Sequence, residues 1–171
     1  VLLPDGYRIE VVLAWGDPIS DGPRWDPHAN QTAAEQAVQM GMHADGLYFF
    51  PLPLRSSSSS RGLLCVNNEY TDEGLLHQGG LNPVTPEKVL KSQNAHGVTI
   101  VEIAFDGGRW QVVRPSSFGR RVTVNTPMRF AGPAAGHALL RTTADPAGTS
   151  PRGTLNNCAM GATPWGTYLT C

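Results

Sequence analysis

The side chains most able to do chemistry gather in residues 153–171. This stretch carries asparagine, threonine and cysteine side chains and no charged side chain. Its pattern fits neither an amphipathic helix nor a simple alternating strand. Its glycines and Pro164 favour turns and close backbone approach, while amide, hydroxyl and thiol groups are potential oxygen and sulfur ligands. Composition alone favours a glycine-rich loop that joins two strands around a buried thiol, and a metal or substrate site is the alternative.

A second candidate is Glu69, which follows the apolar run 62–66 and two asparagines, Asn67 and Asn68. A buried carboxylate without a partner is costly, so Glu69 must be capped, ion-paired, bound to a metal or exposed. The residues alone favour an exposed glutamate.

Three other polar positions each have two interpretations. His96 precedes an apolar run and is expected to be a core or turn histidine more often than a ligand. Glu102 interrupts that run, and a salt bridge with Arg109 or Arg114 would satisfy it. Residues 132–137 are either a tight turn before a short helix or a backbone that approaches an anion.

The elements expected around these residues are mostly strands. Apolar alternation or continuous apolar runs predict strands over 7–14, 46–52, 62–66, 98–105, 109–114 and 120–124. Residues 106–108 form an Asp-Gly-Gly turn, which predicts a hairpin. Thr85 and Pro86 predict a helix start, with the helix running to about residue 93, and a short helix is expected within 31–42. Five serines at 56–60 predict an exposed loop tip.

Composition narrows the class of protein. Only 16% of the 171 residues are charged, and 19 glycines with 14 prolines indicate a turn-rich β protein. The net charge of −1 gives no electrostatic reason to expect nucleic acid or an anionic membrane as partner. No apolar run approaches the roughly 20 residues of a membrane helix. Three widely separated cysteines allow at most one disulfide bond.

Five stretches in order resemble the PhoX-type alkaline phosphatases: 6–19, 62–71, 95–103, 126–137 and 153–171. Together they span nearly the whole chain. The resemblance implies an all-β fold, mainly strands with short helices, that is part of a β-propeller. It also implies that residues 1–171 are the N-terminal portion of one PhoX-like domain, and that this portion alone is inactive.

The resemblance further implies hydrolysis of small phosphate monoesters at a cluster of Fe³⁺ and Ca²⁺ ions. It also implies that the enzyme is a monomer, and that twin-arginine export takes it to the periplasm or out of the cell. It assigns Cys158 and Glu69 as metal ligands. The family has a histidine where Asn68 stands, so no role of that imidazole carries over. No catalytic group is assigned. Residues expected to support the metals or bind substrate are Asn157, Thr163, Trp165 and His137.

Two alternatives to the phosphatase stay open on the sequence. A calcium-propeller esterase of the lactonase type would also use Glu and Asn ligands, although it gives no reason for Cys158. A propeller that only binds a partner would keep the shape without the chemistry.

Overall fold

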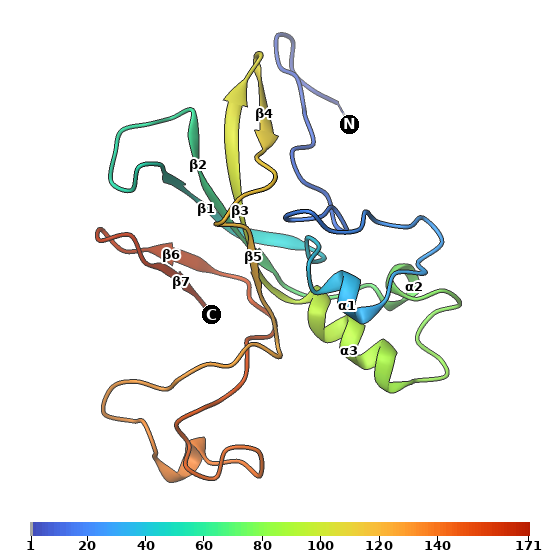
Figure 1. Ribbon diagram of the computed structural model, residues 1–171, viewed down its shortest axis with the longest axis vertical. Helices are drawn as coiled ribbons and strands as arrows, with labels where there is room; N and C mark the ends of the chain where they lie inside the picture. The colour runs from blue at the N-terminus through green and yellow to red at the C-terminus, as the bar shows by residue number, and fades with distance from the viewer. Residues whose placement is uncertain (1) are drawn as a thin grey trace.

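The computed structural model describes residues 2–171 and centres on a five-stranded antiparallel sheet (Figure 1). The strand order is β1-β2-β3-β4, and β5 pairs with β3. A separate hairpin, β6 with β7, lies near β1. The strands are β1 Ala44–Pro51, β2 Arg61–Asn68, β3 Gly97–Asp106, β4 Arg109–Val112, β5 Arg120–Val122, β6 Met160–Ala162 and β7 Tyr168–Thr170.

The helices are short and gather on one side of the sheet (Figure 1). They are α1 Ala33–Gln36, α2 Glu73–Leu76 and α3 Pro86–Ala95, with a 3-10 helix, η1 Ala138–Leu140, in the long loop 123–152. The Thr85 hydroxyl accepts from the Lys88 N–H and caps α3, and Pro86 occupies the first turn. Within residues 2–171, no helix is long and apolar enough to cross a membrane.

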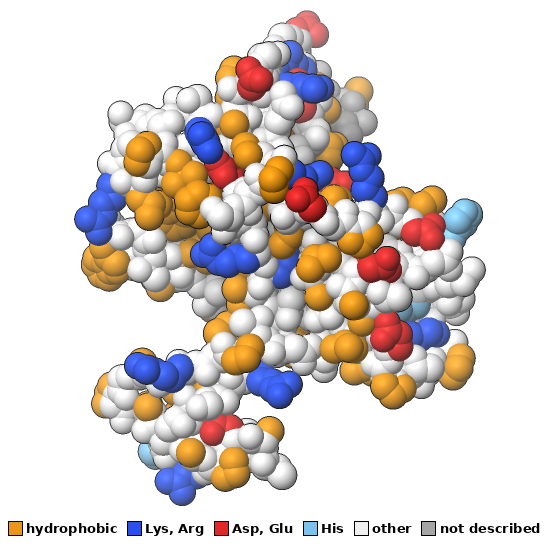
Figure 2. Space-filling view, in the orientation of Figure 1, with side chains coloured by type: hydrophobic (Ala, Val, Ile, Leu, Met, Phe, Trp, Pro, Cys, Tyr) orange, Lys and Arg blue, Asp and Glu red, His pale blue; other side chains and the backbone are white. Residues whose placement is uncertain are grey.

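The core lies on both faces of β2 and β3, because successive side chains of a strand point to opposite sides. One cluster contains Phe50, Leu63, Cys65, Val98 and Ile100, and the other contains Ile19, Val101 and Ile103. Loop 123–152 extends away from this core (Figure 1). On the face seen in Figure 2, basic and acidic side chains are interspersed.

Most sequence predictions are confirmed. Strands lie in all of the predicted ranges from 46 to 124, the 106–108 turn joins β3 to β4, and α3 begins as expected. The serine run lies in the loop between β1 and β2. All three cysteines are free. The mainly β class is confirmed, and the sheet and hairpin do not by themselves form a closed propeller.

One predicted element is wrong. Residues 7–14 form no strand, because their alternating side chains find no partner strand within the described residues; Tyr7 and Val11 are 74% and 80% exposed. The short helix expected within 31–42 is confirmed as α1, Ala33–Gln36. It ends there because the chain turns to form a β-bridge between Gln39 and Pro18.

Glu102 pairs with a residue other than those expected. Its Oε1 accepts from Arg61 Nε at 2.7 Å, and its Oε2 accepts from Ser116 Oγ at 2.6 Å. Arg61 lies on β2, directly beside β3, so it reaches Glu102 in place of Arg109 or Arg114. The Glu102 carboxylate is therefore buried but fully paired.

Candidate metal site

The two predicted metal ligands come from segments that meet at the end of β2. The Cys158 carbonyl accepts from Asn67 Nδ2 at 2.8 Å and from the Gly46 N–H at 3.1 Å. Asn156 Nδ2 donates to the Glu69 carbonyl at 3.2 Å. The backbones at Cys158 and Glu69, which are far apart in the sequence, therefore lie along the same edge, at the end of β2.

Asn67 holds these segments together. Its Oδ1 accepts from the hydroxyls of Tyr168 and Thr170, both at 2.9 Å. Its Nδ2 donates to the carbonyls of Cys158 and Ala159, at 2.8 and 3.1 Å. The side chain is fully buried, and these four bonds use its whole donor and acceptor capacity. Sequence reasoning missed this positioning residue, because its partners are about a hundred residues away.

The Tyr168 hydroxyl stays protonated in this network. Burial raises the pKa of Tyr168 to about 12, and the nearby Cys65 and Asp45 add to the shift. The hydroxyl therefore remains a donor at neutral pH, shared between Asn67 and the Gly46 carbonyl. Burial also raises the pKa of the Cys65 thiol to about 11, so Cys65 stays an apolar core residue.

Asn157 is buried next to Cys158 and belongs to the same network. Its Oδ1 accepts from Thr154 Oγ1 at 2.8 Å, and its Nδ2 donates to Thr170 Oγ1 at 2.8 Å. Thr170 in turn donates to Asn67. Asn157 therefore fixes the backbone one residue before Cys158 through contacts within the chain.

The backbone around Cys158 leaves little space. A Cβ on Gly46 would lie 2.6 Å from the Cys158 carbonyl oxygen and 2.8 Å from Met160 Cγ, so β1 can approach Cys158 only with glycine at this position. Asn156 has a φ of +56°, in the left-handed region that asparagine tolerates better than most residues. Cys171 lies beside Cys158, whose N–H donates to the Cys171 carbonyl at 3.2 Å.

Thr163 and Trp165 lie in the turn between β6 and β7. Thr163 Oγ1 accepts from the Thr167 N–H at 2.9 Å, which closes the turn. Trp165 is 66% exposed, and its carbonyl accepts from Arg55 Nη2 at 3.2 Å. The structure therefore places both residues at the tip of the hairpin that carries Cys158 at its base.

His137 lies in loop 123–152, which extends away from the sheet (Figure 1). Its Nδ1 accepts from the Leu139 N–H at 3.2 Å and caps η1. The preceding residues form a tight turn in which the Ala135 N–H donates to the Gly132 carbonyl. His137 is not brought next to Cys158 or Glu69 by any contact among the described residues.

Asn68 supports the half-buried guanidinium of Arg121. Its Oδ1 accepts from Thr99 Oγ1 at 2.6 Å and from Arg121 Nη1 at 2.8 Å, while Arg121 Nη2 donates to the carbonyls of Asn94 and His96. Burial lowers the pKa of Arg121, which still stays protonated at neutral pH. An amide oxygen suits this guanidinium, whereas an imidazolium in its place would repel it. His96 is a turn histidine, since its Nδ1 contacts the Ser92 carbonyl at 2.8 Å.

The described residues do not form a complete metal site by themselves. Within residues 2–171, no three His, Cys, Asp or Glu side chains come together as a metal-binding group. Calcium takes six to eight oxygen ligands, and a thiolate selects a softer transition metal. One thiol and one carboxylate along the edge at Cys158 and Glu69 do not complete either coordination sphere, so the described residues alone do not fit the cluster.

Comparisons with known proteins agree on one family. The family model described as alkaline phosphatase PhoX matches residues 1–171. A solved structure of Pseudomonas fluorescens PhoX in complex with vanadate, a transition-state analogue, is 44% identical, with a TM-score of 0.93. The match covers 99% of this chain and 29% of that chain. A search of curated proteins found no match.

Proposed function

Because the chain belongs to the PhoX alkaline phosphatase family, as its five motifs predicted, we propose that it is part of an enzyme that hydrolyses phosphate monoesters. The observation that carries this proposal is the similarity, over nearly the whole chain, to a PhoX solved with a transition-state analogue. Such analogues bind far more tightly than substrates, because an active site is complementary to the transition state.

In this proposal, Cys158 and Glu69 hold metal ions of an Fe³⁺ and Ca²⁺ centre. The softness of a thiolate suits iron, and the carboxylate of Glu69 suits calcium or iron. The metals would neutralise charge on the phosphoryl oxygens. The other ligands would come from residues outside this span, since the chain covers 29% of the matched structure.

The contribution of this chain is then to position Cys158. The buried side chains of Asn67 and Asn157 are linked through the Thr170 hydroxyl in a hydrogen-bond chain next to Cys158, and Gly46 allows β1 to contact the Cys158 carbonyl. Hydrogen bonds that fix a metal ligand tune the affinity of the site. Thr163 and Trp165, on the same hairpin, are the residues we propose to lie nearest the substrate. The position of His137, in loop 123–152, does not support the role in substrate binding that was expected for it.

We also propose, from family membership alone, that the enzyme is a monomer exported to the periplasm or the extracellular space and that it acts on small phosphate monoesters. The class of substrate follows from the reaction, because a metal centre that stabilises a phosphoryl group requires only a phosphate ester and a leaving group.

The test uses the full-length protein. Hydrolysis of p-nitrophenyl phosphate and bound iron and calcium are measured for the wild type, Cys158→Ala and, as a matched thiol control, Cys171→Ala. We expect Cys158→Ala to lose iron and at least a hundredfold in hydrolysis, and Cys171→Ala to keep both. A wild type that binds calcium but no iron and cleaves only carboxylic esters would instead indicate the lactonase type, and one that hydrolyses nothing would indicate a binding propeller.

A further inference from the structure

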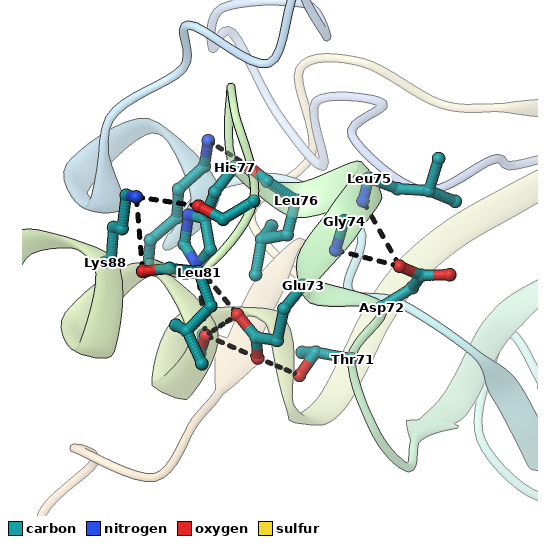
Figure 3. Close-up of polar contacts among 12 residues, drawn as sticks. Thr71, Asp72, Glu73, Gly74, Leu75, Leu76, His77, Leu81 and Lys88 are labelled. Atoms are coloured by element: carbon teal, nitrogen blue, oxygen red, sulfur yellow. Dashed lines mark hydrogen bonds and ion pairs between the residues drawn. The ribbon is translucent and has the colours of Figure 1, made fainter. Parts of the chain in front are cut away.

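The N-terminal segment, residues 7–11, differs from the rest of the fold in how its groups are paired. At α2, for comparison, the Glu73 carboxylate accepts from Thr71 and Ser92 and lies 2.8 Å from His77 Nε2 (Figure 3). That carboxylate has its partners within the chain. The N-terminal segment has neither a partner for its backbone nor a cover for its apolar side chains among the described residues.

Every second residue of the N-terminal segment is large, apolar and exposed. Tyr7, Ile9 and Val11 are 74%, 64% and 80% exposed. Between them, Arg8 Nε lies 3.2 Å from Glu10 Oε1 in an exposed ion pair. Residues two apart lie on the same face of a strand. An extended N-terminal segment therefore has one apolar face and one charged face.

The backbone of the segment is open as well. Within residues 2–171, the N–H and carbonyl groups of residues 8–11 form no hydrogen bond with another part of the chain. An exposed segment with unpaired backbone groups and an apolar face is a template for pairing with another strand. What the segment lacks is a neighbouring strand and a layer that covers its apolar face.

β4 lies beside the segment but does not pair with it. A space of about 440 Å³ is lined by residues 10–12 and by residues 109–111 of β4. The segment is nevertheless anchored, because Arg8 Nη2 donates to the Gly108 carbonyl in the β3–β4 turn, and residues 12 and 13 pack against the core cluster around Val101. The segment is thus held beside the sheet while its apolar face stays uncovered.

We propose that residues 7–11 are an edge strand that pairs with a strand from the part of the full-length protein outside residues 1–171. The chain covers 29% of the matched PhoX structure, so the larger part of that fold lies outside this span. The partner strand bonds to the open backbone of residues 8–11, and apolar side chains of the same part cover Tyr7, Ile9 and Val11.

An intramolecular partner is favoured over a second copy of the chain, because segments of one polypeptide meet at a high effective concentration whatever the protein concentration. The charged face with Arg8 and Glu10 stays in contact with water. The pairing does not depend on the phosphatase activity.

Photo-crosslinking in the full-length protein identifies the partner. Tyr7→p-benzoylphenylalanine places an aromatic crosslinker on the apolar face with little change in shape. Arg24→p-benzoylphenylalanine is the control, because Arg24 is exposed and outside the segment. We expect position 7 to crosslink, within one polypeptide, to a residue beyond position 171 that the control does not reach. Crosslinks that join two copies, that stay within residues 1–171 or that do not form would overturn the proposal.

Hydrogen–deuterium exchange of the full-length protein measures the pairing itself. Alternate amides of a paired edge strand are bonded, so we expect amides within residues 8–11 to exchange at least roughly tenfold more slowly than in a free peptide of the same sequence. Val11→Asp, which places a carboxylate on the apolar face, should restore fast exchange there. Glu10→Gln, the matched control on the charged face, should keep the wild-type rates.

Wild-type exchange in residues 8–11 as fast as in the free peptide would overturn the proposal, as would protection that disappears on dilution, which indicates a second copy. Peptides of β3 report whether Val11→Asp is folded; if it is not, the wild-type rates and the crosslink decide. Hydrolysis of p-nitrophenyl phosphate is measured on the same samples. Protection in a protein that hydrolyses nothing would support the pairing and refute the phosphatase proposal.

Discussion

Replacing Asn67 with alanine should release the hairpin that carries Cys158. The change removes the four hydrogen bonds of this buried side chain. Each is worth about 0.5–1.5 kcal/mol net. The Cys158 carbonyl and the Tyr168 hydroxyl each keep a second hydrogen bond, to Gly46. The loss of stability is therefore smaller than four bonds at the upper value would give. We expect the hairpin to be destabilised locally by about 3 kcal/mol.

Hydrogen–deuterium exchange with mass spectrometry on the full-length protein measures this effect locally. A loss of about 3 kcal/mol corresponds to roughly 150-fold faster exchange of protected amides in residues 153–171. Peptides from the centre of β3 should keep their wild-type rates, as should all peptides of Asn30→Ala, which alters an exposed asparagine. Exchange in 153–171 of Asn67→Ala within about threefold of the wild type would refute the positioning role.

Three further changes have signs fixed by the structure. Gly46→Ala places a Cβ 2.6 Å from the Cys158 carbonyl oxygen and should cost about 1–3 kcal/mol, seen as a lower thermal midpoint. The pKa of Glu102 in the folded protein is lowered chiefly by the Ser116 hydrogen bond, against the opposing effect of burial. The ionised carboxylate therefore stabilises the fold fully above the ordinary pKa of 4.5, and this stabilisation is lost as the pH falls through the lowered pKa of the folded protein. Urea titrations between about pH 3 and pH 6 should therefore show a flatter acid limb for Glu102→Gln than for the wild type. Arg121→Lys has too few donors for the four bonds of the guanidinium and should lower stability by about 2 kcal/mol in the same urea assay, whereas an unchanged midpoint would contradict it.

The elements with local signals could be predicted from the sequence. The hairpin of β3 and β4 follows from its Asp-Gly-Gly turn and alternating residues, and α3 follows from Thr85 and Pro86 at its start. β2 follows from a short apolar run between polar residues. In each case the residues that decide the structure are neighbours in the chain.

Elements that depend on distant partners could not be predicted in this way. Residues 7–14 have the alternation of a strand but no strand beside them within the described residues, and alternation alone cannot supply one. Glu102 pairs with Arg61 because of the β2–β3 register, which the sequence does not reveal.

The candidate metal site falls between these cases. The family resemblance pointed to Cys158 and Glu69, and the structure adds that their backbones lie along one edge. The role of Asn67 required the structure, because a buried asparagine in a strand has no local pattern that distinguishes it from a turn residue. Its four partners include residues on β7 and next to β6.

The most direct test of the account is X-ray absorption spectroscopy at the iron edge of the full-length protein. It asks whether the sulfur of Cys158 binds iron. The account predicts a sulfur neighbour to iron in the wild type and in Cys171→Ala, and none in Cys158→Ala. An iron–sulfur signal that persists in Cys158→Ala, or a wild type without iron, would contradict it.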